Sequence, residues 1–222
     1  MAGYTVYGRA TSSNVQALLW GMEELGLAYD RLDRGEVHGG LDTAEFRAMN
    51  PHGRIPVLQL PGGEALFETA AILRHLASVA DDDRFWPADP VARARVDMWA
   101  EWSKYEVAAA FTGTVFWRAV RTRSAYRDAK AIARATDRFE AALARGMAQV
   151  APGGFLCGQD MTLADIQFGH VLYRYFDAGL ARREVPGLRP YYHRLTERPA
   201  YRHTVMVPYD KLRDTFGGPE GD

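Results

Sequence analysis

Residues 50–69 read NPHGRIPVLQLPGGEALFET, and this stretch decides most of the fold. The apolar, β-branched run at 55–60 predicts a short strand, and a Pro-Gly-Gly turn then leads to a second strand at 65–67. Pro56 lies inside the first strand, and because proline cannot donate to a sheet it belongs at an edge or a strand start. The backbone N–H and C=O of Ile55 are then free to pair with an extended ligand. The alternative is that Pro56 simply marks an edge strand that binds no ligand.

Outward from this stretch, residues 1–80 mix strand and helix signals, and 81–90 look like a linker with a charge run and two prolines. Only helical patterns follow in 91–215, and 217–222 read as a low-complexity tail. Strands are expected at 4–7, 29–33, 55–60 and 65–67, and helices at 15–25, 44–49, 72–79, 91–120, 132–150, 162–180, 188–195 and from 199 onward. The prediction is a small α/β domain followed by an all-α domain.

Composition narrows the function classes. The chain has 222 residues, a formal charge of -1 and 25% charged residues, so nothing suggests a nucleic-acid partner or an anionic membrane surface. No apolar run approaches the roughly 18–20 residues that cross a bilayer, and residues 1–8 lack the features of a signal peptide. The single cysteine, Cys157, fits a reducing compartment, and we interpret it as a packing residue. The expected location is the cytoplasm.

Four polar residues, Thr11-Ser12-Ser13-Asn14, stand between the first expected strand and the first expected helix. A helix N-terminus carries free N–H groups and the positive end of the helix dipole. Side chains there can cap the helix, or they can help to bind an anion. Capping is the simpler interpretation for any one of them, but a cap needs only one, so the run also predicts an anion site.

Two further helix starts carry polar pairs. Glu68 and Thr69 precede an apolar helix, where they could compensate the dipole or receive the ammonium and carboxylate of an amino-acid end. Thr162 and Asp165 are spaced as a capping box, with Asp in place of the usual Glu. We interpret the second pair as a folding signal and the first as a candidate binding site.

In this order and spacing, the chain resembles the glutathione transferase superfamily from about residue 4 to about residue 208. The motifs that carry the resemblance are Ser12-Ser13-Asn14, Asn50-Pro51, Ile55-Pro56, Glu68-Thr69 and Thr162-Leu163-Ala164-Asp165. It is most similar to bacterial serine-type members of the theta, zeta and nu kind. The resemblance implies a thioredoxin-like N-terminal domain, a helical C-terminal domain and a homodimer.

The resemblance also implies a glutathione site. Pro56 would be cis, whereas general statistics for X-Pro bonds put a cis form at about 5%. The cysteinyl backbone of glutathione would pair with Ile55, and its γ-glutamyl end would meet Glu68 and Thr69. The glycyl carboxylate would lie within reach of His38 or Arg54, with His52 a weaker candidate. The implied binding set is Ser12, Asn14, His38, Arg54, Ile55, Pro56, Glu68 and Thr69.

Catalysis in this family needs the thiolate of glutathione, because the thiolate is the nucleophile. A hydroxyl or amide donor at a helix N-terminus lowers the thiol pKa. Ser12 is the leading candidate and Asn14 the second, while Thr11 and Ser13 stay possible and Tyr7 ranks lower. The loop has no cysteine, which argues against cysteine-type chemistry. The maleylacetoacetate isomerase branch typically has Ser-Ser-Cys here, so that branch is disfavoured.

The electrophile pocket is expected on the first helix of the second domain, where aromatic residues suit an apolar co-substrate. Trp102, Ser103 and Glu106 are the candidates, although most aromatic residues of this helix are expected in the core or an interface. Glutathione is the expected co-substrate, and no metal is expected because the six histidines show no metal-ligand spacing. A glutathione-dependent disulfide reductase or peroxidase, or a non-catalytic binding protein, remain alternatives.

Overall fold

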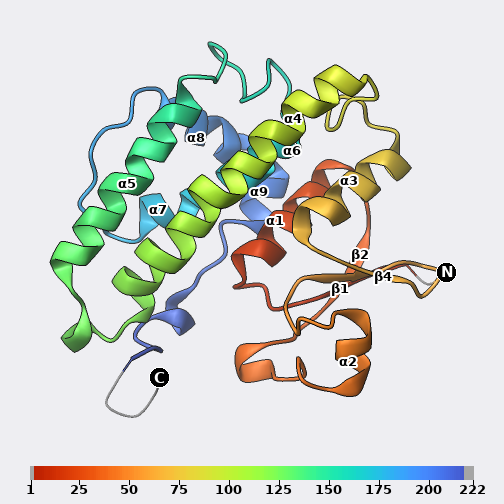
Figure 1. Cartoon of the computed structure of the whole chain (residues 1–222), viewed down its shortest axis with the longest axis horizontal. Helices are drawn as coiled ribbons and strands as arrows, with labels where there is room; N and C mark the ends of the chain where they lie inside the picture. Colours follow the sequence, from red (N-terminus) through yellow and green to blue (C-terminus); the bar gives the residue numbers. More distant parts are fainter. Residues whose placement is uncertain (1–2, 218–222) are drawn as a thin grey trace.

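The computed structural model describes residues 3–217, and the low-complexity end of the chain beyond residue 217 lies outside this range. Figure 1 shows two parts, an N-terminal α/β domain and a larger helical domain. The sheet has four strands, β1 (Tyr4–Tyr7), β2 (Tyr29–Leu32), β3 (Val57–Gln59) and β4 (Ala65–Phe67). Their order is β2-β1-β3-β4, with β1 parallel to β2 and antiparallel to β3, and β3 antiparallel to β4.

Three helices flank the sheet: α1 (Ser13–Glu24), α2 (Ala44–Met49) and α3 (Thr69–Ala80). Alternation along β1 separates the two faces, since Val6 is fully buried in the core formed with α1 and α3, whereas the next residue, Tyr7, packs edge-on against Phe46 of α2. Gly21 lets α1 and α3 approach closely, because a Cβ there would lie 2.3 Å from Leu73 Cδ2.

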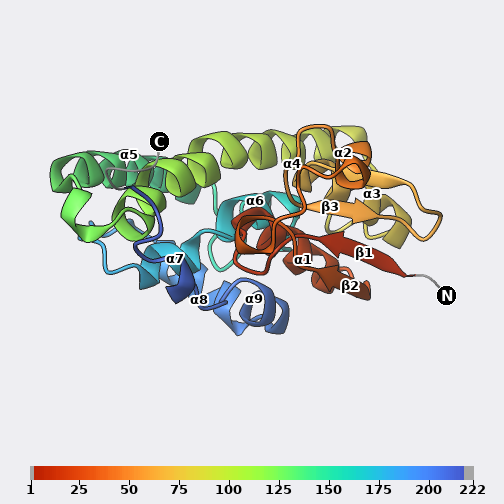
Figure 2. The ribbon, with the colours of Figure 1, turned by 90° about the horizontal axis from the view of Figure 1, so that it is seen from below.

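The second domain is built from helices only. Its long element begins as α4 (Pro90–Trp102) and continues as the π-helical segment η2 (Ser103–Arg121), with α5 (Ala129–Met147) packed alongside (Figures 1 and 2). The remaining helices are α6 (Leu163–Gly169), α7 (Leu172–Asp177), α8 (Leu188–Glu197) and α9 (Pro199–Thr204), and short 3-10 turns lie at η1 (Glu36–His38), η3 (Ser124–Tyr126) and η4 (Asp210–Leu212). No helix of the described residues is long and apolar enough to cross a membrane.

The predicted fold class is confirmed, with two corrections to the helices. The helix expected at 91–120 is α-helical only as far as Trp102 and then winds as a π-helix. The helix expected at 162–180 is divided, because α6 ends at Gly169 and α7 starts at Leu172. Gly169 lies at this break, and glycine is unfavourable in the interior of a helix. Gly169 also allows close packing here, since a Cβ would lie 2.6 Å from Leu195 Cδ1.

The two domains are joined through α1, which packs against α6 and α9. Glu24, at the end of α1, accepts hydrogen bonds from the indole of Trp20 (2.9 Å) and from Nε of Arg198 (2.7 Å), the residue before α9. Because this carboxylate ties α1 to the helical domain, the start of α1 has a fixed position relative to the helices that face it.

Candidate functional site

The start of α1 has a loosely engaged cap. Ser12 is the N-cap residue, and its Oγ accepts from the N–H of Val15 at 3.5 Å, beyond the usual 2.7–3.2 Å for such a bond. Ser13 is buried, whereas Asn14 is exposed on the first turn. The hydroxyl of Ser12 and the amide of Asn14 therefore stay candidates to serve a ligand, and so does Thr11, which is half-buried like Ser12.

The start of α3 lies beside the start of α1. The Oγ1 of buried Thr69, the first residue of α3, donates to the backbone oxygen of Asn14 over 3.4 Å. Two helix N-termini thus converge, each with free N–H groups and a positive dipole end. This arrangement favours an anion between them.

Glu68, the residue before α3, has an unusual backbone. Its φ of 69° lies in the left-handed region, which costs free energy for a residue with a side chain. Its Oε2 lies 2.6 Å from Nζ of Lys104, which comes from η2 in the other domain. The carboxylate is therefore paired within the fold, and its role toward a ligand ammonium stays a prediction. Lys104 itself was not foreseen, because nothing in its local sequence marks it.

The Ile55–Pro56 bond is cis, as the family resemblance implied. Since β3 begins only at Val57, Ile55 precedes the paired part of its strand. Its side chain lies against Gly8 at the end of β1, where an added Cβ would be 3.2 Å from Ile55 Cβ and 2.5 Å from Val15 Cγ2. Gly8 thereby allows Ile55 to sit close to the start of α1.

The residues expected at the glycyl end of glutathione are less closely defined. His38 is exposed on η1, with Nε2 3.9 Å from Oδ1 of Asp33. Arg54 is also exposed, and its backbone oxygen accepts from Asn50 Nδ2 at 2.8 Å. The ring of His52 packs edge-on against Phe67. The choice between His38 and Arg54 stays a prediction.

The three residues expected in the electrophile pocket contact other residues of the helical domain. Ser103 is completely buried, and its hydroxyl has no partner among the described residues. Glu106 faces Arg145 of α5 at 3.6 Å, and Trp102 packs against Trp99 and Phe168. None of these contacts joins them to the residues predicted to bind glutathione, so their role stays a prediction.

Tyr7 and Cys157 are engaged elsewhere. The hydroxyl of Tyr7 donates to Gln59 Oε1 over 3.1 Å, on the sheet face that carries α2. Cys157 is half-buried, and burial, together with the nearby charge of Asp165, raises its pKa to about 11. Its thiol is therefore protonated at neutral pH and unsuited to act as a nucleophile.

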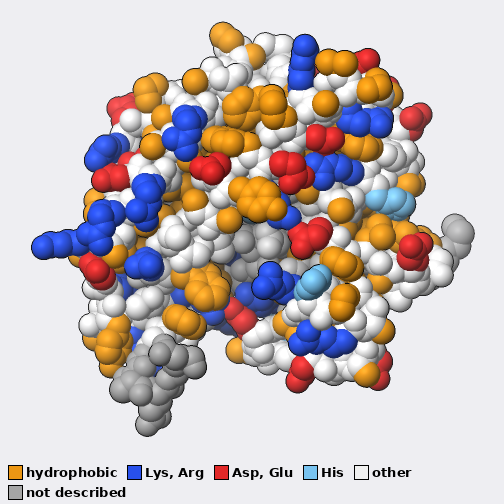
Figure 3. All heavy atoms as spheres, viewed as in Figure 1, with side chains coloured by type: hydrophobic (Ala, Val, Ile, Leu, Met, Phe, Trp, Pro, Cys, Tyr) orange, Lys and Arg blue, Asp and Glu red, His pale blue; other side chains and the backbone are white. Residues whose placement is uncertain are grey.

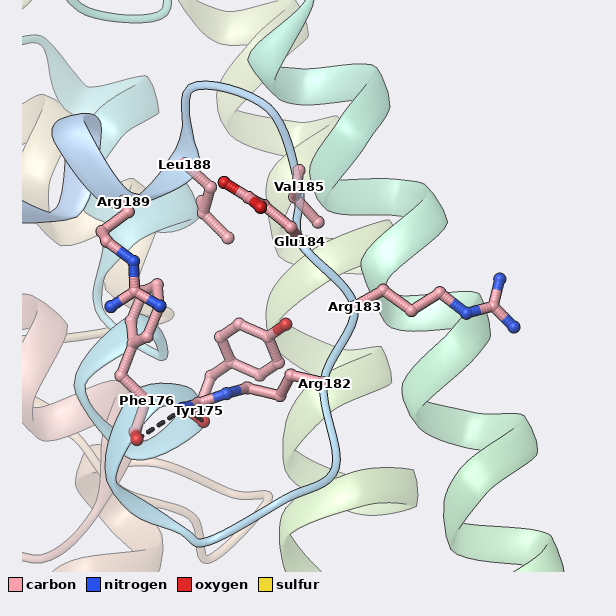
Figure 4. A pocket seen from close by; sticks show the side chains of 8 residues that line it. All are labelled: Tyr175, Phe176, Arg182, Arg183, Glu184, Val185, Leu188 and Arg189. Carbon is pink, nitrogen blue, oxygen red and sulfur yellow. Dashed lines mark hydrogen bonds between the residues drawn. The ribbon is translucent and has the colours of Figure 1, made fainter.

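Figure 3 shows a hollow between the two domains, with acidic and basic side chains at its edges. A separate cavity of about 310 Å³ lies in the helical domain (Figure 4), and none of the residues predicted to bind glutathione lines it. One of its lining residues, Arg182, donates to the backbone oxygens of Tyr175 and Phe176. That arginine holds the chain in place there, so we assign the candidate site to the junction of the domains.

Three arginines were missed by the sequence analysis. Arg174 of α7 is buried, and its Nη2 donates to the backbone oxygen of Thr11 over 2.7 Å. Arg9 and Arg121 both lie 2.8 Å from the same oxygen of Glu36. These residues come from distant parts of the chain, and no local sequence motif predicts that they lie together near Ser12.

Comparison with known proteins identifies the family of this chain. Residues 11–79 match the family described as glutathione S-transferase, N-terminal domain, and residues 108–199 match glutathione S-transferase, C-terminal domain. Glutathione S-transferase GstB of Escherichia coli K12 is 34% identical over 205 residues, covering 92% of this chain and 98% of that protein. Elongation factor 1-gamma of Trypanosoma cruzi is also 34% identical, but over 81% of this chain and only 43% of its own length.

Among solved structures, the theta class glutathione S-transferase of Xanthomonas axonopodis pv. citri with glutathione bound is similar throughout. It is 39% identical with a TM-score of 0.86, and the match covers 94% of this chain and 99% of that one. Both domains, their order and nearly the full length of these two glutathione S-transferases are therefore shared. The chain is a member of the glutathione S-transferase family of enzymes.

Proposed function

We propose that this protein activates the thiol of glutathione at the start of α1 for attack on an apolar electrophile. The observation that carries the proposal is the convergence of the α1 and α3 N-termini, linked by Thr69 and the backbone oxygen of Asn14. A similar chain was solved with glutathione bound, which supports glutathione as the ligand.

Glutathione would lie across this junction as an extended peptide. Its cysteinyl backbone would pair with Ile55, which precedes the paired part of β3. The ammonium of its γ-glutamyl end would approach Glu68, in the position that Lys104 Nζ now takes, and the carboxylate would meet Thr69 and the α3 N-terminus. The glycyl carboxylate would be met by His38 or Arg54.

The sulfur would then point at the start of α1. A donor there stabilises the thiolate more than the thiol, so it lowers the thiol pKa and raises the population of the nucleophile at neutral pH. Ser12 is suited to this because its bond to Val15 is long, and Asn14 because its amide is exposed. The thiolate forms a carbon–sulfur bond, and the leaving group departs with its electron pair.

We further propose a homodimer in the cytoplasm. Val91, Met98 and Tyr105 recur every seven residues along α4 and the start of η2 and are 58–69% exposed, which suits burial against a second copy. The single cysteine fits a reducing compartment. Light scattering of the purified protein would report the dimer directly.

The test of the proposed function is conjugation of glutathione to 1-chloro-2,4-dinitrobenzene. We expect Ser12→Ala to lower kcat/KM by about 10²–10³-fold, the typical cost of removing one stabilising donor. Thr43→Ala is the matched control, because Thr43 caps α2 in the same domain, away from the proposed site, and it should leave kcat/KM unchanged.

Other outcomes of this experiment are equally informative. A loss confined to Asn14→Ala would assign the donor role to Asn14. Faster reduction of a glutathionyl disulfide or a hydroperoxide than conjugation would favour the reductase or peroxidase alternative. Glutathione binding without turnover of a broad electrophile panel would contradict catalysis and favour a binding protein.

A further inference from the structure

Three arginines from three elements meet at the domain junction: Arg9 after β1, Arg121 at the end of η2 and Arg174 on α7. Arg9 Nη2 and Arg121 Nη1 each lie 2.8 Å from the same oxygen of Glu36. Arg174 is close enough for the charges of the other three residues to affect its pKa. We call Arg9, Arg121 and Arg174 the arginine cluster.

The arginine cluster has more positive charge than its partners compensate. Only Glu36 bridges its members among the described residues. Arg174 is 3% exposed, and neither its Nε nor that of Arg9 has a partner within residues 3–217. A buried cation without an anion is costly. Consistent with this, burial and the neighbouring arginines lower the pKa of Arg174 to about 10. Within residues 3–217, Glu36 balances one of the three positive charges, so the cluster can accept an anion.

The arginine cluster adjoins the proposed thiol site. Arg174 Nη2 donates to the oxygen of Thr11, the residue before Ser12, over 2.7 Å. The N–H of Ser12 in turn donates to the oxygen of Arg9 over 3.1 Å. An anion held by the cluster would therefore lie next to the atoms expected to face the sulfur of glutathione.

Aromatic rings surround the same guanidinium groups. Arg174 lies over Phe116 at 4.7 Å and near Tyr209 at 5.6 Å, and Arg121 lies over Trp117 at 4.8 Å. Phe116 and Tyr209 are 1% and 2% exposed, so they only hold Arg174 in place, whereas Trp117 is 37% exposed. The accessible ring of Trp117 beside the N–H donors of Arg121 suits a molecule that has an aromatic ring and a carboxylate. The two features occur together, which favours one ligand that uses both.

We infer that the preferred electrophile of this protein is an aryl carboxylate, or a similar aromatic anion, whose charged group is held by the arginine cluster. This inference rests on the proposed function and names its substrate class. The thiolate attacks the ring carbon that bears a leaving group, the carbon–sulfur bond forms and a halide leaves with the electron pair. The carboxylate only orients the ring and is unchanged by the reaction.

The test compares two electrophiles of similar size and shape, of which only the first is an anion: 4-chloro-3-nitrobenzoate and 4-chloro-3-nitrobenzamide. For each, kcat/KM is divided by the rate constant of the uncatalysed reaction with glutathione, which removes the difference in intrinsic reactivity. We expect this acceleration to be at least about 10-fold larger for the benzoate, since charged hydrogen bonds add strongly to binding.

Arg121 is the member of the cluster to vary, because the side chain of Arg174 also holds the backbone of Thr11 and Arg9 itself belongs to the thiol loop. We expect Arg121→Gln to lower the benzoate-to-benzamide ratio by about 10–100-fold and Arg121→Lys to restore part of it. Arg118→Gln, an exposed arginine on the same segment, is the matched control and should leave the ratio unchanged.

Equal acceleration of the two electrophiles by the wild type would overturn the inference and leave the proposed function intact. So would an Arg121→Gln variant that loses affinity for glutathione, measured by calorimetry, without a change in the ratio, since the cluster would then serve glutathione itself. Conjugation of neither compound, or of any electrophile, would instead contradict the proposed function.

A second measurement does not depend on the variants folding. Unreactive 3-nitrobenzoate and 3-nitrobenzamide are compared as inhibitors of 1-chloro-2,4-dinitrobenzene conjugation by the wild type. We expect the benzoate to inhibit at a concentration about 10-fold lower and to compete with the electrophile rather than with glutathione. Equal inhibition by the two compounds would contradict the inference.

Discussion

Two helix starts in this protein share a similar sequence pattern and differ in what surrounds them. α1 begins after Ser12 and α6 begins after Thr162, both hydroxyl caps. At α6 the capping box is complete, because the backbone N–H of Thr162 donates to Asp165 Oδ2 over 2.9 Å while Thr162 Oγ1 accepts from Ala164 over 3.3 Å. At α1 the cap bond is 3.5 Å, and no acid closes the box.

The acid at α6 is also fully occupied. Asp165 is 0% exposed, and its two oxygens accept from Leu156, Tyr191 and, twice, Thr162. The polar side chains at the start of α6 therefore all form hydrogen bonds within the fold. At the start of α1, Ser12 and Asn14 are left available to a ligand. A polar helix start that is satisfied internally stabilises the fold, and one that is left open can bind a ligand.

Removing the acid of α6 tests the stabilising half of this comparison and should have the largest effect. We expect Asp165→Ala to lower the free energy of unfolding by about 4 kcal/mol, because several buried donors lose their acceptor together. Asp160→Ala, an exposed acid of the preceding loop, is the control. Urea unfolding measures both, and a loss below about 1 kcal/mol for Asp165→Ala would contradict the structural role of the closed cap.

The far end of α6 adds a pH dependence. His170 is buried, and burial lowers its pKa to about 4 from the usual value of 6.5. Between these values the unfolded chain binds a proton that the folded protein excludes, so stability falls as the pH falls from 6.5 to 4, by about 3 kcal/mol in total.

Urea unfolding at several pH values checks this, with the wild type compared with His170→Gln. The variant should lack this part of the slope, whereas His193→Gln, at an exposed position, should retain it. The same slope in His170→Gln as in the wild type would show that other groups cause the acid sensitivity.

Glu68 tests the binding half of the comparison. We expect Glu68→Gln to raise the dissociation constant of glutathione about 10-fold, since a charged partner of the γ-glutamyl ammonium is lost. Stability should change by less than about 0.5 kcal/mol, because the Glu68–Lys104 pair is largely exposed.

Calorimetric titration with glutathione measures the effect. Glu101→Gln is the matched control, because Glu101 also pairs with a cation, Arg74, in an exposed position. If both variants bind glutathione as tightly as the wild type, Glu68 does not receive the ligand.

Substitutions of the two cap residues should have smaller effects on stability than Asp165→Ala. We expect Thr162→Ala to lower the free energy of unfolding by about 1–2 kcal/mol and Ser12→Ala by less than about 0.5 kcal/mol, because the bond at Ser12 is already long. Thermal unfolding of the two variants side by side checks the order. A larger loss for Ser12→Ala would mean that its hydroxyl is a structural cap and not a free donor.

Most of the fold could be predicted from the local sequence. Alternation, turn residues and helical periodicity located the four strands and most helices, because each depends on neighbours along the chain. The polar run after β1 and the pair Glu68-Thr69 were found in the same way. The cis bond before Pro56 came from the family resemblance, since proline alone argues for trans.

The features that the sequence analysis missed depend on contacts between residues far apart in the chain. Lys104 and the arginine cluster become visible only when the two domains pack together, so no window of sequence reveals them. The directions of the side chains along α4 and η2 could not be predicted from the sequence either. Ser103 lies in the core and Glu106 faces Arg145, and the periodicity of the sequence does not distinguish the π-helical segment η2 from an α-helix.

The most direct test of the central claim is the pKa of the thiol of bound glutathione, followed by thiolate absorbance as the pH is raised. The account predicts a pKa well below that of free glutathione in the wild type and in Thr162→Ala, and a return toward the free value in Ser12→Ala. Should the loss appear only in Asn14→Ala, the donor is Asn14 and the site stands. Glutathione bound with an unshifted thiol in the wild type would contradict thiol activation at the start of α1.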